Sequence, residues 1–116
     1  MIGTRYKVQF WTNQWYSFGH YFMRVISDLF LVSLVQPDRS LNVPLYRQIY
    51  DAMRLAILDG RIARGAKLPS SRDMATLLQV SRNTILNAVD QLIAEDYLEA
   101  RVGAGIFVTG ELPDQV

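Results

Sequence analysis

Two helix-start signals, at Ser70 and Ser81, follow each other so closely that the segment between them has little conformational freedom. Ser70 followed by Asp73 fits a capping box, in which the serine oxygen accepts from an amide of the first turn and the carboxylate reaches back to the cap amide. Ser81 begins the next helix, so the turn holds only Gln79 and Val80. Two helices joined this tightly must cross at a large angle.

Each of the two predicted helices has one apolar face. In the first helix this face consists of Met74, Ala75 and Leu78. The second helix runs from Ser81 towards Asp96, and its inward stripe consists of Ile85, Ala88, Val89 and Leu92, with Ile93 at the edge. Val80 lies between the two faces and can fill the corner where the helices meet. The pattern predicts a packed pair of helices with one side of each exposed.

The exposed side of the second helix has groups suited to duplex DNA over its first two turns: Arg82, Asn83, Leu86 and Asn87. Asparagine pairs bidentately with adenine, arginine pairs with guanine or phosphate, and an apolar side chain contacts the thymine methyl group. The amides at a helix start favour a phosphate. Ordinary surface residues would explain any single asparagine. The combination favours DNA, because the acids gather at the other end, at Asp90, Glu95, Asp96 and Glu99.

A β-hairpin is predicted after the helices. Residues 97–102 and 106–109 are two short β-prone runs, separated by Gly103-Ala104-Gly105. Glycine at both ends suits a turn with positive φ. Arg101 stands just before the turn, so the tip can enter a minor groove or contact phosphate. The alternative is a hairpin that only closes the edge of the domain.

Composition supports one small domain of 116 residues with a core, because half of the chain is apolar. The net charge of +1 does not by itself indicate nucleic-acid binding. The distribution of charge is more informative, because six cations lie in loops, caps and hairpin that would flank one DNA face. They are Arg61, Arg64, Lys67, Arg72, Arg82 and Arg101. Without cysteine there is no disulfide or thiolate metal site, and a cytoplasmic chain is expected.

Residues 1–35 hold most of the aromatic side chains. They lack the pattern of a secretory signal, and His20, Arg24 and Asp28 interrupt any membrane span. So much aromatic surface should be buried, and a homodimer contact is favoured over an extension that packs without function. Periodicity does not decide whether residues 29–35 form a strand or part of a helix.

The best boundary in the chain is the polar, proline-containing segment 36–40. A helix then begins near Pro44 and stops at Gly60, and residues 61–69 form a loop or a very short strand. The expected organisation is an extension over residues 1–40, a domain over 41–110 and the start of a linker over 111–116. The expected fold is mainly α with a small β-hairpin: a winged helix-turn-helix, with a three-helix core plus wing and an aromatic-rich N-terminal extension.

Residues 44–109 resemble the winged-helix domain of the GntR family of bacterial transcription regulators, most of all its MocR branch. The matching strings are PLYRQI (44–49), LDGRI (58–62), KLPSSR (67–72), VSRNT (80–84) and RVGAGIFV (101–108). The resemblance implies phosphate or base contacts by Arg72, Ser81, Arg82, Asn83 and Thr84, and by the wing around Gly103 and Gly105.

Two positions depart from the family pattern. Gln79 stands where the family usually has glycine, so a left-handed backbone there would carry strain of about 1 kcal/mol. Leu86 stands where some GntR regulators have a basic or polar contact, so base preference cannot be transferred. MocR-type regulators carry a C-terminal aminotransferase-like domain that binds pyridoxal phosphate through a lysine and mediates dimerisation. Lys7 and Lys67 are the only lysines here, so we expect no pyridoxal phosphate and no other cofactor on this chain.

An enzyme is disfavoured, because the chain has one histidine, no cysteine, no phosphate-cradling glycine loop and no paired carboxylates in an apolar setting. The expected function is sequence-specific binding of double-stranded DNA by a transcription regulator, with an operator as partner and no membrane. Two alternatives stay open: a winged-helix module that binds protein, and a homodimer without DNA affinity.

Overall fold

The computed structural model describes residues 28–111. Residues 28–34 are helical, and three helices and two strands of the winged-helix part follow. These elements are α2 (Leu45–Leu58), α3 (Ser71–Leu78), α4 (Arg82–Ala94), β1 (Leu98–Arg101) and β2 (Gly105–Val108). The chain divides into two compact units, Met1–Phe30 and Leu31–Val116, and the second contains all the labelled elements. The predictions for residues 1–27, including the aromatic dimer contact, lie outside the described residues.

Helix α2 begins after Pro44, whose φ of −55° and ψ of 143° make it the residue before the first helical turn. Its buried residues, Ile49, Met53 and Ile57 among them, recur at helical spacing. The helix ends at the predicted glycine: Gly60 has a φ of 81°, and the Ile62 amide donates to the Ala56 carbonyl at 3.0 Å. The predicted stop is therefore confirmed.

The predicted polar break before α2 is an ordered loop. Asp38 accepts hydrogen bonds from the amide and hydroxyl of Ser40, at 2.9 Å and 2.6 Å, and these bonds lower the pKa of the Asp38 carboxyl. The Gln48 side chain accepts from the Asp38 amide at 2.8 Å and donates to the carbonyls of Asp38 and Val43, both at 2.9 Å. These contacts tie the loop to α2.

Both predicted serine caps are present. The Ser70 hydroxyl oxygen accepts from the Asp73 amide at 3.1 Å, and the Ser81 oxygen accepts from the Thr84 amide at 3.1 Å. Between them Gln79 ends α3 in the left-handed conformation, with φ 55° and ψ 46°. The tight turn between two capped helices is confirmed.

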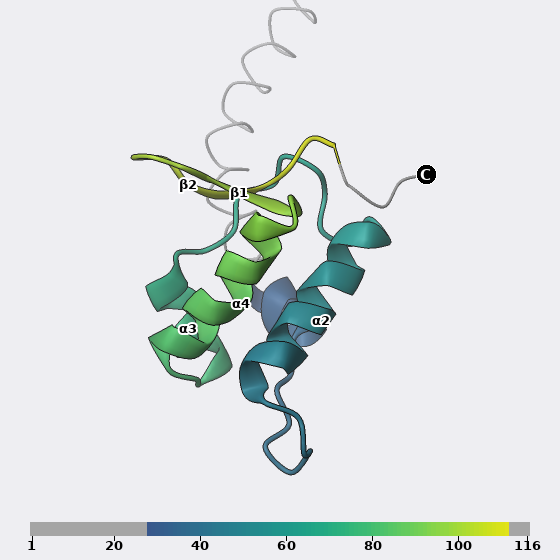
Figure 1. Ribbon diagram of the computed structural model, residues 1–116, viewed down its shortest axis with the longest axis vertical. Helices are drawn as coiled ribbons and strands as arrows, with labels where there is room; N and C mark the ends of the chain where they lie inside the picture. Colours follow the sequence, from purple (N-terminus) through teal and green to yellow (C-terminus); the bar gives the residue numbers. More distant parts are fainter. Residues whose placement is uncertain (1–27, 112–116) are drawn as a thin grey trace, which may run out of the picture. The chain divides into compact units, whose positions relative to one another are not determined.

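The core lies between α2, α3 and α4, with the sheet across one end of α4 (Figure 1). The predicted inward stripe of α4 is buried at Ile85, Ala88, Val89 and Leu92, and the α3 face is buried at Met74, Ala75 and Leu78. Val80 packs against this core, half-buried, at the corner between the helices. Each large apolar side chain removed from water in this way contributes about 1.5–3 kcal/mol. The orientation of α4 is thereby set by its buried face.

The helical residues before α2 contribute to the same core. Leu31 and Val35 are 3% and 1% exposed and belong to the buried cluster. Residues 29–35, for which strand and helix stayed open, are helical as far as Leu34. The domain start at residue 41 stays a prediction, but the core includes these two residues on its N-terminal side.

The hairpin pairs β1 with β2 antiparallel, from Leu98 opposite Val108 to Arg101 opposite Gly105. The prediction placed Gly105 in the turn, whereas the turn is Val102-Gly103-Ala104 and Gly105 is the first residue of β2. Gly105 has a φ of 122°, which glycine alone adopts readily. This conformation lets β2 begin at Gly105, one residue before the predicted start at Ile106.

The segment before α3 attaches the hairpin to the helices. Lys67 forms a bridge to Phe107, the Leu68 amide donates to the Ile106 carbonyl at 2.9 Å, and the Val108 amide donates to the Ala66 carbonyl at 2.9 Å. The very short strand proposed within residues 61–69 is therefore this bridge. The fold class predicted from the sequence, a winged helix-turn-helix, is confirmed. Within residues 28–111, no helix has both the length and the apolar character needed to cross a membrane.

Candidate nucleic-acid interface

The outward face of α4 is open at its start. Arg82, Asn83 and Asn87 are exposed and Leu86 is half-buried, as the helical spacing predicted. In the described part of the chain, the side chain of Arg82 makes no hydrogen bond or ion pair. The guanidinium and the two amide side chains are thus available to a ligand on this face.

The cap of α4 has one hydroxyl hydrogen to spare. The hydroxyls of Ser81 and Thr84 lie 2.8 Å apart, and one of them donates to the other. Since the Ser81 oxygen also accepts from the Thr84 amide, the pair keeps a single hydroxyl hydrogen for an outside acceptor. The amides in the first turn of α4 have no carbonyl acceptor within the helix. Their partial positive charge also favours an anion at this end of the helix.

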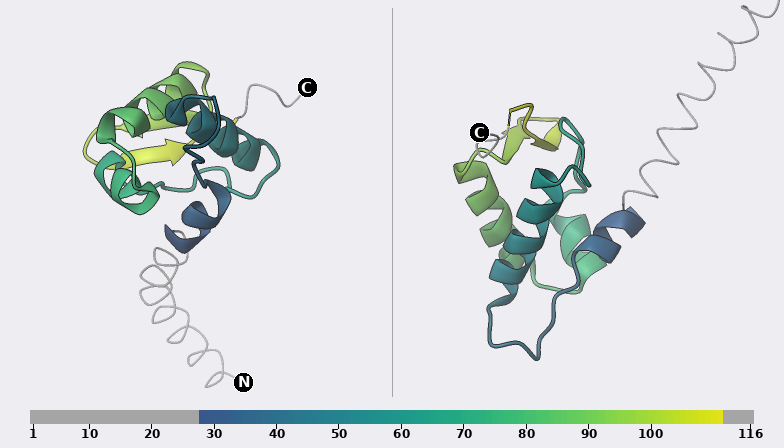
Figure 2. Two further views of the ribbon diagram at one scale, coloured as in Figure 1. Left: turned by 90° about the horizontal axis from the view of Figure 1, so that it is seen from below. Right: turned by 90° about the vertical axis from the view of Figure 1, so that its right-hand side faces the viewer.

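Arg72 extends the basic surface onto α3. It is the second residue of that helix, and its side chain is exposed without a hydrogen bond or ion pair within residues 28–111. Figure 1 and the left view of Figure 2 place α3 and the hairpin turn on the same side of the molecule, away from α2. Helix α4 begins next to the end of α3, so the three elements converge on one side.

The hairpin tip is exposed throughout. Val102 is 105% exposed, the highest value among the large apolar side chains in the described chain, and Gly103 has a φ of 76° with open space where a Cβ would stand. A Cβ on Gly105 would meet the Lys67 side chain at 3.0 Å. Val102 was not among the residues predicted from the sequence to lie at the site, although an apolar residue next to a turn glycine is visible in the sequence.

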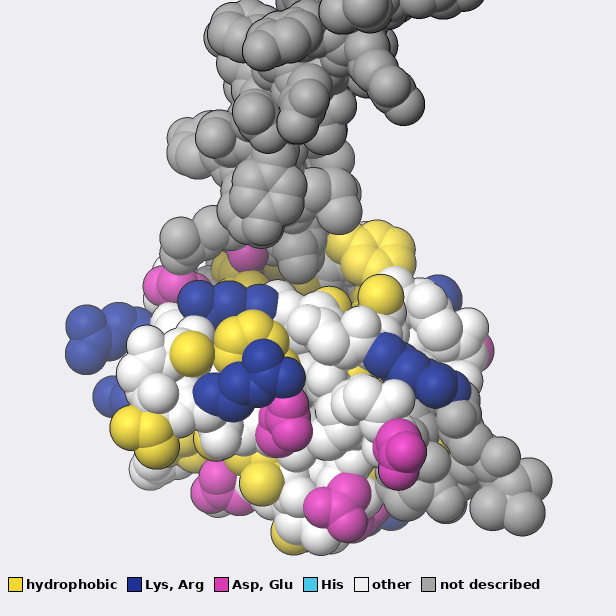
Figure 3. All heavy atoms as spheres, turned by 90° about the horizontal axis from the view of Figure 1, so that it is seen from above, with side chains coloured by type: hydrophobic (Ala, Val, Ile, Leu, Met, Phe, Trp, Pro, Cys, Tyr) yellow, Lys and Arg dark blue, Asp and Glu magenta, His cyan; other side chains and the backbone are white. Residues whose placement is uncertain are grey.

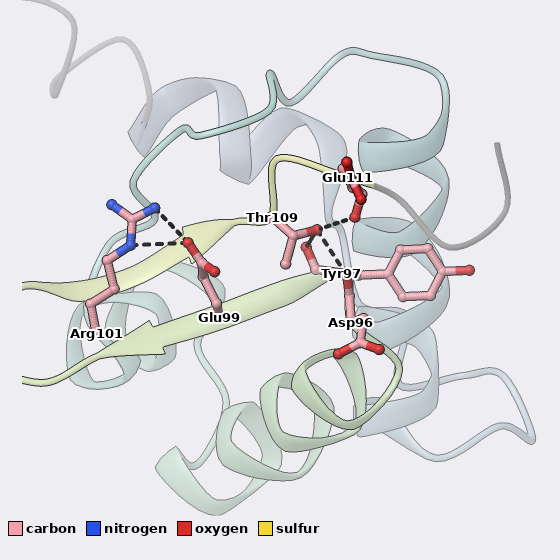
Figure 4. A network of polar contacts seen from close by, with 6 residues as sticks. All are labelled: Asp96, Tyr97, Glu99, Arg101, Thr109 and Glu111. Atoms are coloured by element: carbon pink, nitrogen blue, oxygen red, sulfur yellow. Dashed lines mark hydrogen bonds and ion pairs between the residues drawn. The ribbon is translucent and has the colours of Figure 1, made fainter.

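Arg101, the predicted wing cation, is already engaged within the protein. Its Nε and Nη2 donate to Oε1 of Glu99 at 3.0 Å and 2.5 Å (Figure 4). Its guanidinium lies 4.1 Å from the centre of the Phe107 ring. Glu99 was grouped with the acids at the far end of α4, whereas it lies on β1 of the hairpin and accepts hydrogen bonds from Arg101. Strand alternation places residues 99 and 101 on one face, so the contact had a sequence signal.

Charge on the hairpin side of the molecule is mixed rather than uniformly basic. Figure 3 shows basic side chains separated by acidic and uncharged ones. Arg61 is paired with Asp59 at 2.9 Å, which lowers the pKa of the Asp59 carboxyl and raises that of Arg61. Of the six predicted cations, those without an ion pair in the described chain are Arg64, Lys67, Arg72 and Arg82.

A contact that sequence reasoning missed braces the turn before α4. Arg39 Nη2 donates to the carbonyl oxygen of Gln79 at 2.6 Å. The bond joins residues far apart in the chain, so no local pattern could indicate it. It holds the residue that directs the chain from α3 into α4.

The far end of α4 is fastened to α2 by a polar cluster. The Tyr50 hydroxyl donates to Glu95, Gln91 also donates to Glu95, and Arg54 Nε donates to the Tyr97 hydroxyl at 3.1 Å. Burial, followed by the bond to Glu95, raises the pKa of Tyr50 to about 12, and the bond from Tyr50 lowers the pKa of Glu95. This end is occupied by internal contacts, in contrast to the open start.

Within residues 28–111 there is no candidate metal site. No group of three histidine, cysteine or acidic residues is placed to hold a metal ion there. His20 lies outside the described residues. The geometry offers a surface for binding a ligand, built from α3, α4 and the hairpin.

Known proteins with similar sequence are transcription regulators. The family described as bacterial regulatory proteins, gntR family, matches residues 45–108. The probable rhizopine catabolism regulatory protein MocR of Rhizobium meliloti is 46% identical over 79 residues, which are 68% of this chain and 16% of that protein. The repressor YtrA of Bacillus subtilis is 33% identical over 76 residues, which are 66% of this chain and 58% of YtrA.

Solved structures of the family have the same fold. YtrA from Sulfolobus acidocaldarius, a GntR-family transcription factor, superposes with a TM-score of 0.64 at 29% identity, covering 68% of this chain and 83% of that one. The DNA-binding domain of AraR in complex with operator ORE1 gives a TM-score of 0.55 at 28% identity, covering 66% and 95%.

The chain is short beside its relatives, since it spans between 14% and 16% of the first curated proteins that it matches. The match nevertheless includes all three helices and both strands of the winged helix. The chain therefore belongs to the GntR family of bacterial regulatory proteins, and residues 45–108 are a GntR-type DNA-binding domain.

Proposed function

We propose that this domain binds an operator in double-stranded DNA with the start of α4 in the major groove and the hairpin beside it. The observation that carries the proposal is the open α4 surface, where Arg82, Asn83 and Asn87 are exposed on the side shared with α3 and the hairpin. The similarity to the AraR domain solved with operator DNA supports the same docking mode.

Each side chain has a role that follows from its chemistry. Arg72 and Arg82 neutralise phosphates, and the hydroxyl pair of Ser81 and Thr84 donates its spare hydrogen to a phosphate oxygen. Asn83 and Asn87 read base edges, and Leu86 contacts a thymine methyl group. The hairpin turn around Gly103 approaches the neighbouring groove, where the absence of a side chain allows close contact.

A second copy of the protein is expected on the same operator. Two winged helices related by a twofold axis would read half-sites roughly 10–10.5 base pairs apart, centre to centre, or a multiple of that spacing. We place the protein in the cytoplasm, where bacterial DNA is. Pyridoxal phosphate is not expected on these 116 residues, because Lys7 and Lys67 are their only lysines.

Selection of bound sequences from random duplexes, followed by salt titration, tests the proposal. We expect an enriched motif, and a binding constant for random duplex that falls with salt by a slope of about 0.9 per phosphate contact on a log–log plot. The mixed charge of the hairpin side and the net charge of +1 favour a rival, a module that binds protein. No enriched sequence, together with no salt-dependent binding, would contradict our proposal and leave the protein-binding module as the better account.

A further inference from the structure

Arg101 is restrained from two sides on the outer surface of the hairpin. Glu99, two residues earlier on β1, accepts from Nε and Nη2, and the Phe107 ring on β2 lies under the guanidinium at 4.1 Å from its centre. Glu99 and Phe107 are directly opposite each other in the register of the sheet. A carboxylate and a ring therefore hold one arginine at the place where β1 enters the turn.

Glu99 occupies only one edge of the Arg101 guanidinium, the edge formed by Nε and Nη2. Figure 4 shows the third nitrogen of Arg101 pointing away from Glu99, and the side chains of Arg101 and Glu99 are 51% and 43% exposed. An ion pair this exposed is worth little in water, so an external anion can compete for the same cation. A phosphate is such an anion and binds arginine through the same fork of donors as a carboxylate.

The carboxylate works against that exchange. With Glu99 bound, the charge of Arg101 is largely neutralised, and a DNA phosphate brought to the hairpin meets a negative group beside the cation. The cation would contribute fully to binding only after leaving Glu99. The position of Glu99 thus subtracts from the attraction between the hairpin and any phosphate backbone, whatever the base sequence.

We propose that Glu99 limits the sequence-independent DNA affinity of this domain by holding Arg101 on the face of the hairpin. The inference rests on the proposed function, because it concerns how the same surface meets phosphate. It assigns Glu99 as a residue that tunes affinity and leaves base reading to α4. Binding then depends more on the contacts of α4 and less on the charge of the wing.

A mutant cycle with Glu99→Gln and Arg101→Gln tests this inference on the full chain. Glutamine keeps the size of the side chain and a hydrogen-bond acceptor while it removes the charge. We expect Glu99→Gln to tighten binding of random duplex by roughly two- to fivefold and to steepen the salt slope by about 0.9, equivalent to one more phosphate contact. In the Arg101→Gln background the same change should have less than half of that effect.

Asp90→Asn is the matched control, because it makes the same charge change at an exposed position of α4 beyond its first two turns. Its salt slope should equal that of the parent. Nitrogen-15 NMR of the arginine Nε–H group gives a second readout, since loss of the Glu99 bond should speed hydrogen exchange at Arg101 in the free protein. Thermal melting checks that each variant is folded.

The outcomes separate the two proposals. If Glu99→Gln weakens binding, Glu99 orients Arg101 for DNA and the inference is overturned. Equal tightening with and without Arg101 overturns it as well, because the effect would then be general charge repulsion. If the parent binds no duplex, the proposed function fails and this inference with it, whereas duplex binding without coupling between the two positions removes the inference alone.

Discussion

At the scale of single residues, the backbone strain in the turn between α3 and α4 lies at Gln79. Gln79 stands where the family usually has glycine, and its φ of 55° places its backbone in the left-handed region. Asp96, after α4, is the other non-glycine residue with positive φ in the described chain, at 65°. The resemblance indicated that a left-handed backbone at Gln79 would be strained, but it did not decide the conformation. The Arg39 bond that braces this turn was not predictable either, because that bond depends on where the loop of residues 36–40 packs.

Replacing the strained residue should stabilise the protein. Gln79→Gly is expected to raise the free energy of unfolding by about 0.5–1 kcal/mol, since relief of left-handed strain exceeds the entropy that glycine adds to the unfolded chain. The Arg39 bond is kept, because it is made to the carbonyl of residue 79. Urea unfolding followed by circular dichroism measures the difference.

The matched control makes the same substitution inside a helix. Gln91→Gly, at an exposed position of α4, should lower the free energy of unfolding by about 1 kcal/mol, because glycine is a poor helix former and the contact to Glu95 is lost. Loss of stability in Gln79→Gly, of a size similar to the control, would show that the turn gains nothing from glycine.

Among the elements, α4 contributes one face to the core and the opposite face to the exposed surface. Its buried stripe and its cap were predictable, because both follow from helical spacing and from the chemistry of Ser81. Its far end was not fully predictable: Glu95, one of the acids that gather there, accepts a hydrogen bond from Tyr50 of α2. A contact between two helices that are distant in the sequence produces no periodic pattern from which it could be predicted. The consequence is a pH-dependent link between α2 and α4.

Alkaline unfolding should report that link. The pKa of Tyr50 is raised to about 12, so the unfolded chain, where tyrosine titrates near ~10, loses its proton first. The contribution of Tyr50 to stability is therefore complete below pH ~10 and is lost as pH rises towards about 12. Tyr50→Phe should flatten the fall in unfolding free energy over this range, measured by urea unfolding at several pH values.

Tyr46→Phe provides the comparison, because Tyr46 lies on the same helix and is 42% exposed. Its pH profile should match the parent. Identical profiles for the parent, Tyr46→Phe and Tyr50→Phe would contradict the account of the α2–α4 link.

At the scale of the whole molecule, the winged helix was predictable and the limits of its core were not. Caps, periodic faces and turn glycines predict elements one by one over residues 44–109. Packing decides what else joins them, and Leu31 and Val35 do so from before the polar break. The mixed charge of the hairpin side was also hidden, since a list of cations does not show which of them an acid neutralises. The pairing of Arg61 with Asp59 and of Arg101 with Glu99 removes two of the six predicted cations from the free basic surface.

Removing one of the early core residues should test how far the domain extends. Leu31→Ala is expected to lower the free energy of unfolding by about 2–4 kcal/mol, because a side chain that is 3% exposed would leave a cavity. Leu41→Ala, where leucine is 53% exposed, should change it by less than about 0.5 kcal/mol. Equal and small effects in urea unfolding would restrict the folded domain to residues after the polar break.

The placement of α4 in the groove is tested most directly by comparing salt-dependent duplex binding of three variants, Arg82→Ala, Asn83→Ala and Arg47→Ala, with that of the parent. The account predicts that Arg82→Ala weakens binding to all sequences and lowers the salt slope by about 1, as expected for a phosphate contact. Asn83→Ala should cost about 1–3 kcal/mol on the selected sequence with the slope unchanged, as expected for a base contact. Arg47→Ala, on α2, should bind as the parent does. Arg82→Ala binding every duplex with the affinity and slope of the parent would contradict the account.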